Sequence, residues 1–232
     1  MPPARQAELR ALYDEEVAYT DLHIGRLLDF LTEAGLWDST CVIFVADHGE
    51  KFLDHGSAGH AETLFQELIH VTLLIADPSR PAPAVVNRRV ETRWLFPTIL
   101  NIVRADPPSG SASSSDLFAP CENGEYWVRS STRPQPLSTL REGSVAGIWL
   151  SCLVSDRYKL IRDHAAQKVL LFDLVRDPRE TTDISAAQPD LARRLACHLR
   201  EVDGELGAAP VAPKRPRLDR EQVRRLRDLG YL

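Results

Sequence analysis

Two adjacent residues, Asp47 and His48, directly follow a short apolar run and offer a carboxylate oxygen and an imidazole nitrogen. Such a pair is suited to a divalent cation, because hard cations favour carboxylate oxygens and imidazole is a common metal ligand. Gly49 permits the turn that would point both side chains the same way. A solvated turn, or an aspartate that caps a helix, would look the same in sequence.

Two further histidines, His55 and His60, follow in the same segment, beside Gly56 and Gly59. Three imidazoles and several carboxylates could therefore line one cleft. A structural zinc site made of His48, His55 and His60 is an alternative, although no thiolate or regular zinc spacing accompanies them. Exposed loop histidines are the plainer alternative.

The elements around this segment indicate an α/β fold. Periodic apolar residues predict a long amphipathic helix over residues 8–34, which Gly35 would end. Residues 41–46 and 71–76 are short apolar runs, typical of strands buried on both faces of a parallel sheet. Ligands of open α/β sheets bind beyond the carboxyl ends of the strands, which is where Asp47 stands.

The second half of the chain has a different pattern, with short strands separated by turns. We predict an antiparallel sheet with one helix packed on it; the strands fall in residues 126–129, 147–154, 158–161 and 169–174, and the helix in 189–202. Residues 90–103 before it predict another amphipathic helix. We therefore expect an α/β portion over 1–118 and a small α+β subdomain over 119–232.

Composition restricts the class of protein. The chain has 232 residues, 44% of them hydrophobic, which is enough for a core, and its net charge of −5 argues against nucleic acid as a partner. No apolar run approaches the roughly 18 to 20 residues that span a bilayer, so we expect no membrane span. The first residues contain no signal peptide, so the sequence as it stands would be cytoplasmic, while the location of a longer protein stays open.

Several motifs, taken in order, resemble the C-terminal part of the sulfatase family, which belongs to the alkaline phosphatase superfamily. They are Ala46-Asp47-His48-Gly49-Glu50, Asp54-His55-Gly56, Gly59-His60, Leu95-Phe96-Pro97-Thr98 and Leu171-Phe172-Asp173-Leu174. The resemblance implies an alkaline-phosphatase-like sulfatase fold, with a partial central sheet and helices followed by a small C-terminal antiparallel sheet packed with a helix. It also implies sulfuric ester hydrolysis, with a sulfate ester as the substrate.

The resemblance also implies roles for individual residues. Asp47 and His48 would be ligands of a divalent cation, usually calcium in this family. His60 stands where the family places a His or Lys that contacts the sulfate and the leaving-group oxygen, so it would be the catalytic residue here. His55 would be a second-shell residue behind them.

The family nucleophile is a formylglycine made from Cys in a C-x-P-S-R or C-x-A-S-R motif. None of Cys41, Cys121, Cys152 and Cys197 stands in such a motif, so we expect no nucleophile in this chain. The first hypothesis is a sulfatase-like hydrolase fragment, inactive alone, whose nucleophile and remaining metal ligands belong to an absent N-terminal segment.

Two alternatives remain open. A phosphodiesterase or phosphonate hydrolase of the same superfamily would share the Asp-His pair. A non-catalytic truncated remnant would expose an unpaired sheet edge, so we expect such a chain to oligomerise or aggregate.

Overall fold

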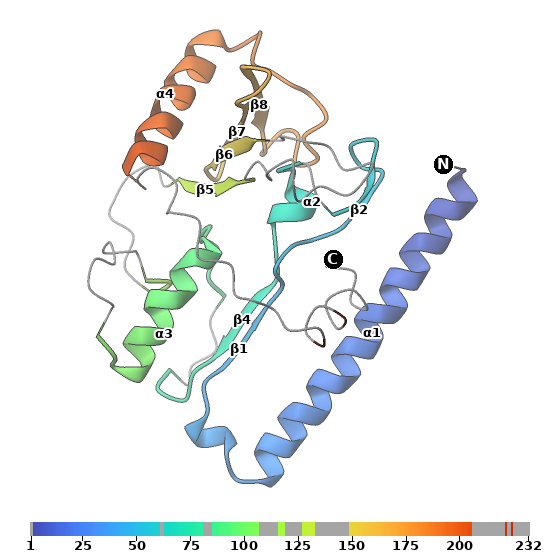
Figure 1. Ribbon diagram of the computed structural model, residues 1–232, viewed down its shortest axis with the longest axis vertical. Helices are drawn as coiled ribbons and strands as arrows, with labels where there is room; N and C mark the ends of the chain where they lie inside the picture. Colours follow the sequence, from blue (N-terminus) through green and yellow to red (C-terminus); the bar gives the residue numbers. More distant parts are fainter. Residues whose placement is uncertain are drawn as a thin grey trace. The chain divides into compact units, whose positions relative to one another are not determined.

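The computed structural model describes residues 2–60, 63–80, 85–106, 116–118, 127–132 and 149–205, together with residues 221 and 224 (Figure 1). The chain divides into two compact units, Met1–Ala196 and Cys197–Leu232. Cys121 lies outside the described residues. Among the helices that are described, none is long and apolar enough to cross a membrane.

The first element is α1 (Pro3–Glu33), the long helix expected from the sequence. Gly35 ends it with a φ of +67°, a conformation in which glycine carries no Cβ penalty. The Gly35 N–H donates to the Thr32 carbonyl at 3.0 Å, and the Leu36 N–H donates to the Leu31 carbonyl at 2.8 Å. This pair of bonds is a Schellman motif, which satisfies carbonyls of the last turn.

Strand β1 (Val42–Val45) pairs with β4 (Leu73–Ala76), and both strands were predicted. The pairing is antiparallel, with Val42 opposite Ala76 and Val45 opposite Leu73, so the expected parallel pairing is wrong (Figure 1). A short apolar run does not encode strand direction. The expected burial on both faces is also wrong among the described residues, because Val45 and Leu74 are exposed.

Between β1 and β4 the chain forms a small hairpin and one turn of helix. Strands β2 (Lys51–Phe52) and β3 (Ala58–Gly59) pair antiparallel, and α2 (Gln66–Ile69) follows. The Phe52 ring lies edge-on to Tyr13 of α1 at 5.2 Å, with the Arg10 guanidinium 5.1 Å from its centre. The N-terminal half of α1 therefore supports the hairpin.

Two short 3₁₀ turns and a third helix complete the first half: η1 (Trp37–Ser39), η2 (Thr92–Trp94) and α3 (Leu95–Val103). Thr98 of α3 is fully buried and has its hydrogen bonds satisfied. Its hydroxyl donates to the Trp94 carbonyl at 2.6 Å and accepts the Leu117 N–H at 2.9 Å. The amphipathic helix predicted over 90–103 is thus found as a 3₁₀ turn that continues into α3.

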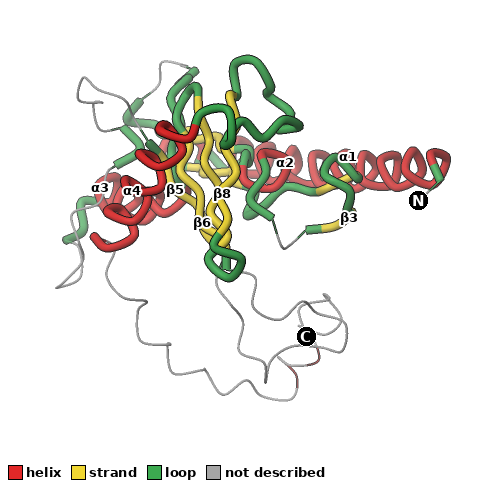
Figure 2. The backbone as a smooth tube through the Cα atoms, turned by 90° about the horizontal axis from the view of Figure 1, so that it is seen from above, coloured by secondary structure: helices red, strands yellow, loops and turns green. Residues whose placement is uncertain are grey.

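The predicted antiparallel sheet is present as β5 (Val128–Ser131), β6 (Leu150–Val154), β7 (Tyr158–Asp163) and β8 (Lys168–Asp173), in that spatial order (Figure 1). Figure 2 shows the strands in yellow, seen from above. Buried side chains of the sheet pack with Leu64 and Leu174 in one core cluster, whose sheet members are Cys152, Val154, Ile161 and Phe172. Leu64 precedes α2, so this core includes the segment that leads from the hairpin to β4. The helix α4 (Pro189–Glu205) follows the sheet, as predicted.

Candidate functional site

Asp47 and His48 leave the end of β1 with exposed side chains, 78% and 42% accessible respectively. The Asp47 Oδ1 atom accepts the backbone N–H of His48 at 2.9 Å, which turns its carboxylate back over the following residue. The same Oδ1 atom lies 3.8 Å from the His48 Nε2 atom. At metal–ligand distances of about 2.1 to 2.4 Å, one cation can contact both atoms.

Gly49 is required by close packing rather than by a left-handed turn. Its N–H donates to the Leu68 carbonyl at 2.9 Å, and a Cβ at this position would lie 2.0 Å from the Glu67 carbonyl oxygen. Among the described glycines, those with positive φ are Gly35, Gly56 and Gly59. The backbone between His48 and Glu50 is therefore seated directly on α2.

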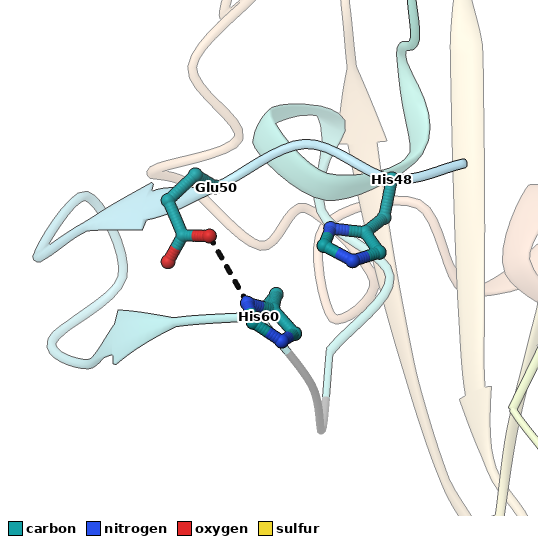
Figure 3. Close-up of side chains that lie close together, drawn as sticks. All are labelled: His48, Glu50 and His60. Carbon is teal, nitrogen blue, oxygen red and sulfur yellow. Dashed lines mark hydrogen bonds and ion pairs between the residues drawn. The ribbon is translucent and has the colours of Figure 1, made fainter. Parts of the chain in front are cut away.

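His60 lies beside His48 although the hairpin separates the two in sequence. The rings stack with centroids 4.4 Å apart and planes inclined by 22° (Figure 3). The His60 Nδ1 atom lies 3.1 Å from the Glu50 Oε2 atom. The sequence motif contains Glu50 but does not indicate this contact, which only the fold reveals.

Hydrogen bonding defines which nitrogen each ring offers. The His48 Nδ1 atom lies 2.8 Å from the Gly49 carbonyl, and the His60 Nδ1 atom faces a carboxylate. Both partners are acceptors, so each Nδ1 carries the hydrogen. Each neutral ring then keeps its lone pair on Nε2, as a histidine does when a carbonyl or carboxylate orients it toward a metal or substrate.

A cavity of about 370 Å³ opens at these side chains. Asp47, His48 and His60 line it together with residues of α2, η2, β5 and their flanking segments, namely Thr63, Leu68, Ile69, Val71, Thr92, Ser130 and Thr132. The hydroxyl groups add hydrogen-bonding capacity to a partly apolar wall. Its volume lies within the range of small-molecule sites.

Two overlapping groups of atoms here could hold a cation. Asp47 and His48 provide one oxygen and one nitrogen, which suits a hard ion that keeps several waters. His48, Glu50 and His60 bring one ligand atom each within 4.8 Å of one another, which suits a later transition metal better. The stacked rings weaken the second option, because the in-plane lone pairs of stacked imidazoles do not converge on one point.

His55 lies in a different environment, with its side chain only 14% accessible. Its ring stacks on Phe65 at 3.6 Å, and its Nδ1 atom lies 2.7 Å from Glu67 Oε1. Its Nε2 atom lies 3.2 Å from the Glu180 carbonyl. His55 therefore joins the hairpin to α2 and to the segment after β8, so the three histidines of the zinc alternative do not come together.

A buried ion pair continues this connection. Lys159 Nζ of β7 lies 2.6 Å from Glu180 Oε1, and both side chains are fully buried. The other carboxylate oxygen of Glu180 accepts the N–H of Gln66, the first residue of α2, at 2.6 Å. Burial lowers the pKa of Lys159 even though the Glu180 carboxylate favours its charged form. The ion pair thus holds the N-terminus of α2, on which Gly49 rests.

Two described cysteines fit structural roles. Cys152 is fully buried in β6, and burial raises its pKa to about 11, so it stays a thiol near neutral pH. Burial, followed by the charge of Asp77, also raises the pKa of Cys41. Neither thiol has the lowered pKa of a reactive cysteine.

Comparison with known proteins relates part of the chain to one family. The sulfatase family model matches residues 2–105, which include Asp47, His48 and His60. The chain is related to the sulfatase family. Arylsulfatase K of Bos taurus is 29% identical to it over 201 residues. These cover 84% of this chain and 36% of that protein, so the chain spans about a third of the relative's length.

Solved structures show that this chain has the fold of part of a sulfatase. A protein solved in complex with its substrate D-glucosamine-2-N,6-O-disulfate superposes with a TM-score of 0.66 at 19% identity, covering 86% of this chain and 41% of that one. The phosphonate monoester hydrolase of Silicibacter pomeroyi has a TM-score of 0.64 at 28% identity, covering 80% and 38%. The expected fold class is confirmed.

Proposed function

We propose that this chain is the part of a sulfatase-type hydrolase that carries the ligands Asp47 and His48 and the catalytic residue His60. The observation that carries the proposal is that these three side chains line one cavity although the β2–β3 hairpin separates His60 from the other two. The relationship to the sulfatase family supports a sulfate monoester as the substrate.

In this proposal each residue has a distinct task. Asp47 and His48 hold a divalent cation, calcium by the family resemblance, which would neutralise charge on the sulfate oxygens. His60 contacts the leaving-group oxygen and offsets the charge that develops there when the S–O bond breaks. His55 acts from further out, because its bond to Glu67 holds α2 and α2 supports Gly49.

The nucleophile would come from outside this sequence. No cysteine of the chain stands in the family's formylglycine motif. The chain also covers only 36% of arylsulfatase K of Bos taurus. An N-terminal sulfatase segment would then supply the nucleophile and the remaining cation ligands. The division into an α/β portion over 1–118 and a subdomain over 119–232 belongs to the same proposal.

A second candidate is hydrolysis of a phosphonate or phosphate ester. The similarity to the Silicibacter pomeroyi phosphonate monoester hydrolase, at 28% identity, favours it. Phosphonate and sulfate esters present similar tetrahedral oxyanions, so the same cation ligands and His60 would serve either substrate.

The experiment is turnover of 4-nitrophenyl sulfate and 4-nitrophenyl phenylphosphonate by the chain alone and by the chain joined to the N-terminal sulfatase segment that the proposal requires. We expect no turnover by the chain alone and sulfate ester turnover by the joined protein. Faster phosphonate turnover would favour the second candidate. A folded joined protein that hydrolyses neither ester would contradict both and favour a non-catalytic remnant.

A further inference from the structure

Glu50 and His60 are brought together by the register of the β2–β3 hairpin. Lys51 pairs with Gly59 and Phe52 with Ala58, so the next step of the same register places Glu50 opposite His60. Directly opposed residues of an antiparallel pair have neighbouring side chains. Their Oε2 and Nδ1 atoms lie 3.1 Å apart (Figure 3).

We propose that Glu50 is the positioning residue of His60, whose Nδ1–H it accepts so that Nε2 is the atom presented to the cavity. The inference rests on the proposed function, in which His60 meets the leaving-group oxygen. It assigns a role to a carboxylate that is not among the residues lining the cavity and does not belong to the Asp47 and His48 pair.

The surroundings of His60 show why it needs such a partner. Its side chain is 63% accessible, so packing alone does not fix its orientation, whereas the Glu50 side chain is only 21% accessible. Glu50 fixes the direction of the ring through Nδ1, and the stacked His48 ring limits its plane. His48 is in turn fixed by its own bond to the Gly49 carbonyl.

An ionised carboxylate can only accept hydrogen bonds, and a neutral imidazole has one N–H to donate. The contact therefore selects the Nδ1–H tautomer and keeps Nε2 available. A free ring would exchange between both tautomers and would spend part of its time with the wrong nitrogen toward the cavity. Orientation of a catalytic histidine by a carboxylate on its second nitrogen is an established way to avoid this loss.

The test is nitrogen NMR of the histidine side chains in the 232-residue chain at a pH where the rings are neutral. We expect the His60 signals of the Nδ1–H tautomer in the wild type and in Glu50→Gln, whose amide oxygen still accepts. We expect Glu50→Ala to show the Nε2–H tautomer or a mixture. Identical His60 signals in all three proteins would overturn the proposal.

A second Glu–His pair in the same chain supplies the control. Glu67→Ala removes the partner of His55, so it should change the His55 signals and leave those of His60 unchanged. Retention of the other backbone signals in Glu50→Ala shows that the chain still folds. A change of His60 in Glu67→Ala as large as that in Glu50→Ala would contradict a specific role for Glu50.

The effect of Glu50 on catalysis is measured as kcat and KM in the chain joined to the N-terminal sulfatase segment. Glu50→Ala should lower kcat about 10- to 100-fold with little change in KM, and Glu50→Gln should restore part of the loss. An unchanged kcat in Glu50→Ala would overturn it. The tautomer is measured without substrate, so a joined protein without hydrolysis would defeat the proposed function separately.

Discussion

A Cβ atom at Gly49 would lie 2.0 Å from the carbonyl oxygen of Glu67, so the backbone beside the candidate cation ligands touches the backbone of α2. Neither backbone can yield to this contact by a rotamer change. The geometry of His48 and Glu50, on either side of Gly49, therefore depends on α2. Since Glu180 holds the first N–H of α2, the four-stranded sheet is connected to the site through a short series of contacts.

Gly49→Ala tests the close approach. The added methyl group must separate residue 49 from α2, so we expect a loss of about 1 to 3 kcal/mol in the free energy of unfolding. Gly25→Ala is the matched control, because nothing lies within 4 Å of its Cβ position in α1 and alanine favours a helix. That control should gain about 0.5 to 1 kcal/mol. Urea unfolding measures both, and equal effects would contradict the packing argument.

Lys159→Met tests the buried ion pair. It leaves the Glu180 carboxylate buried without its cation, so we expect a loss of about 3 to 5 kcal/mol in the free energy of unfolding. Lys159→Met combined with Glu180→Gln removes both charges and keeps an acceptor for the Gln66 N–H, so stability should largely return. Thermal and urea unfolding would measure this.

Arg193→Met is the control for the ion pair, because Arg193 of α4 pairs with Asp190 and both side chains are largely exposed. A solvent-exposed pair contributes little, so this variant should unfold almost as the wild type does. A loss as large as that of Lys159→Met would show that removal of any paired cation, buried or exposed, has the same effect, and would contradict the argument from burial.

Asp183 predicts part of the pH dependence of stability. Burial acts to raise the pKa of Asp183, but hydrogen bonds from the Leu171 and Ser185 N–H groups hold it below its ordinary value. Its contribution is therefore complete above the unfolded-state pKa and is lost as the pH falls through the lower folded-state pKa. Asp183→Asn should be less stable than the wild type at pH 7, and the difference should narrow in acid. A difference that is constant with pH would contradict this.

The exposed apolar side chains predict self-association of the isolated chain. They include Leu12, Val17, Leu22, Leu27 and Phe30 of α1, and Leu74 of β4 is 62% exposed. In the described part of the chain β1 and β4 pair only with each other, which leaves an unpaired edge on each. Sedimentation should show oligomers that decrease in Leu74→Thr. A monomer that melts cooperatively at tens of micromolar concentration would contradict this.

The sequence was sufficient to predict the helices and strands whose local residue pattern is typical of one kind of element. The helix ended by Gly35, the strands of the C-terminal sheet and the polar segment after residue 46 could all be predicted from local patterns. Strand direction could not, because an apolar run at residues 41–46 fits either pairing. The burial of that run also depends on what covers it, which local sequence does not contain.

The site was only partly predictable for the same physical reason. Asp47 and His48 are adjacent, so their proximity needed no fold. The partner of His60 is set by the hairpin register, and strands as short as β2 and β3 carry too few residues for an alternating pattern. His55 was grouped with the other histidines because it is near them in sequence, whereas its contact with Glu180 spans 125 positions.

The central claim is that Asp47 and His48 face one divalent cation beside His60. Calcium titration of the isotope-labelled chain, followed by backbone NMR, tests it most directly. We predict saturable shifts centred on residues 47–49, with an affinity near millimolar because few protein ligands are present. Asp47→Asn should abolish the shifts, and Asp54→Asn, the same charge change in the neighbouring hairpin, should retain them. Shifts that persist in Asp47→Asn, or that centre elsewhere, would contradict the claim.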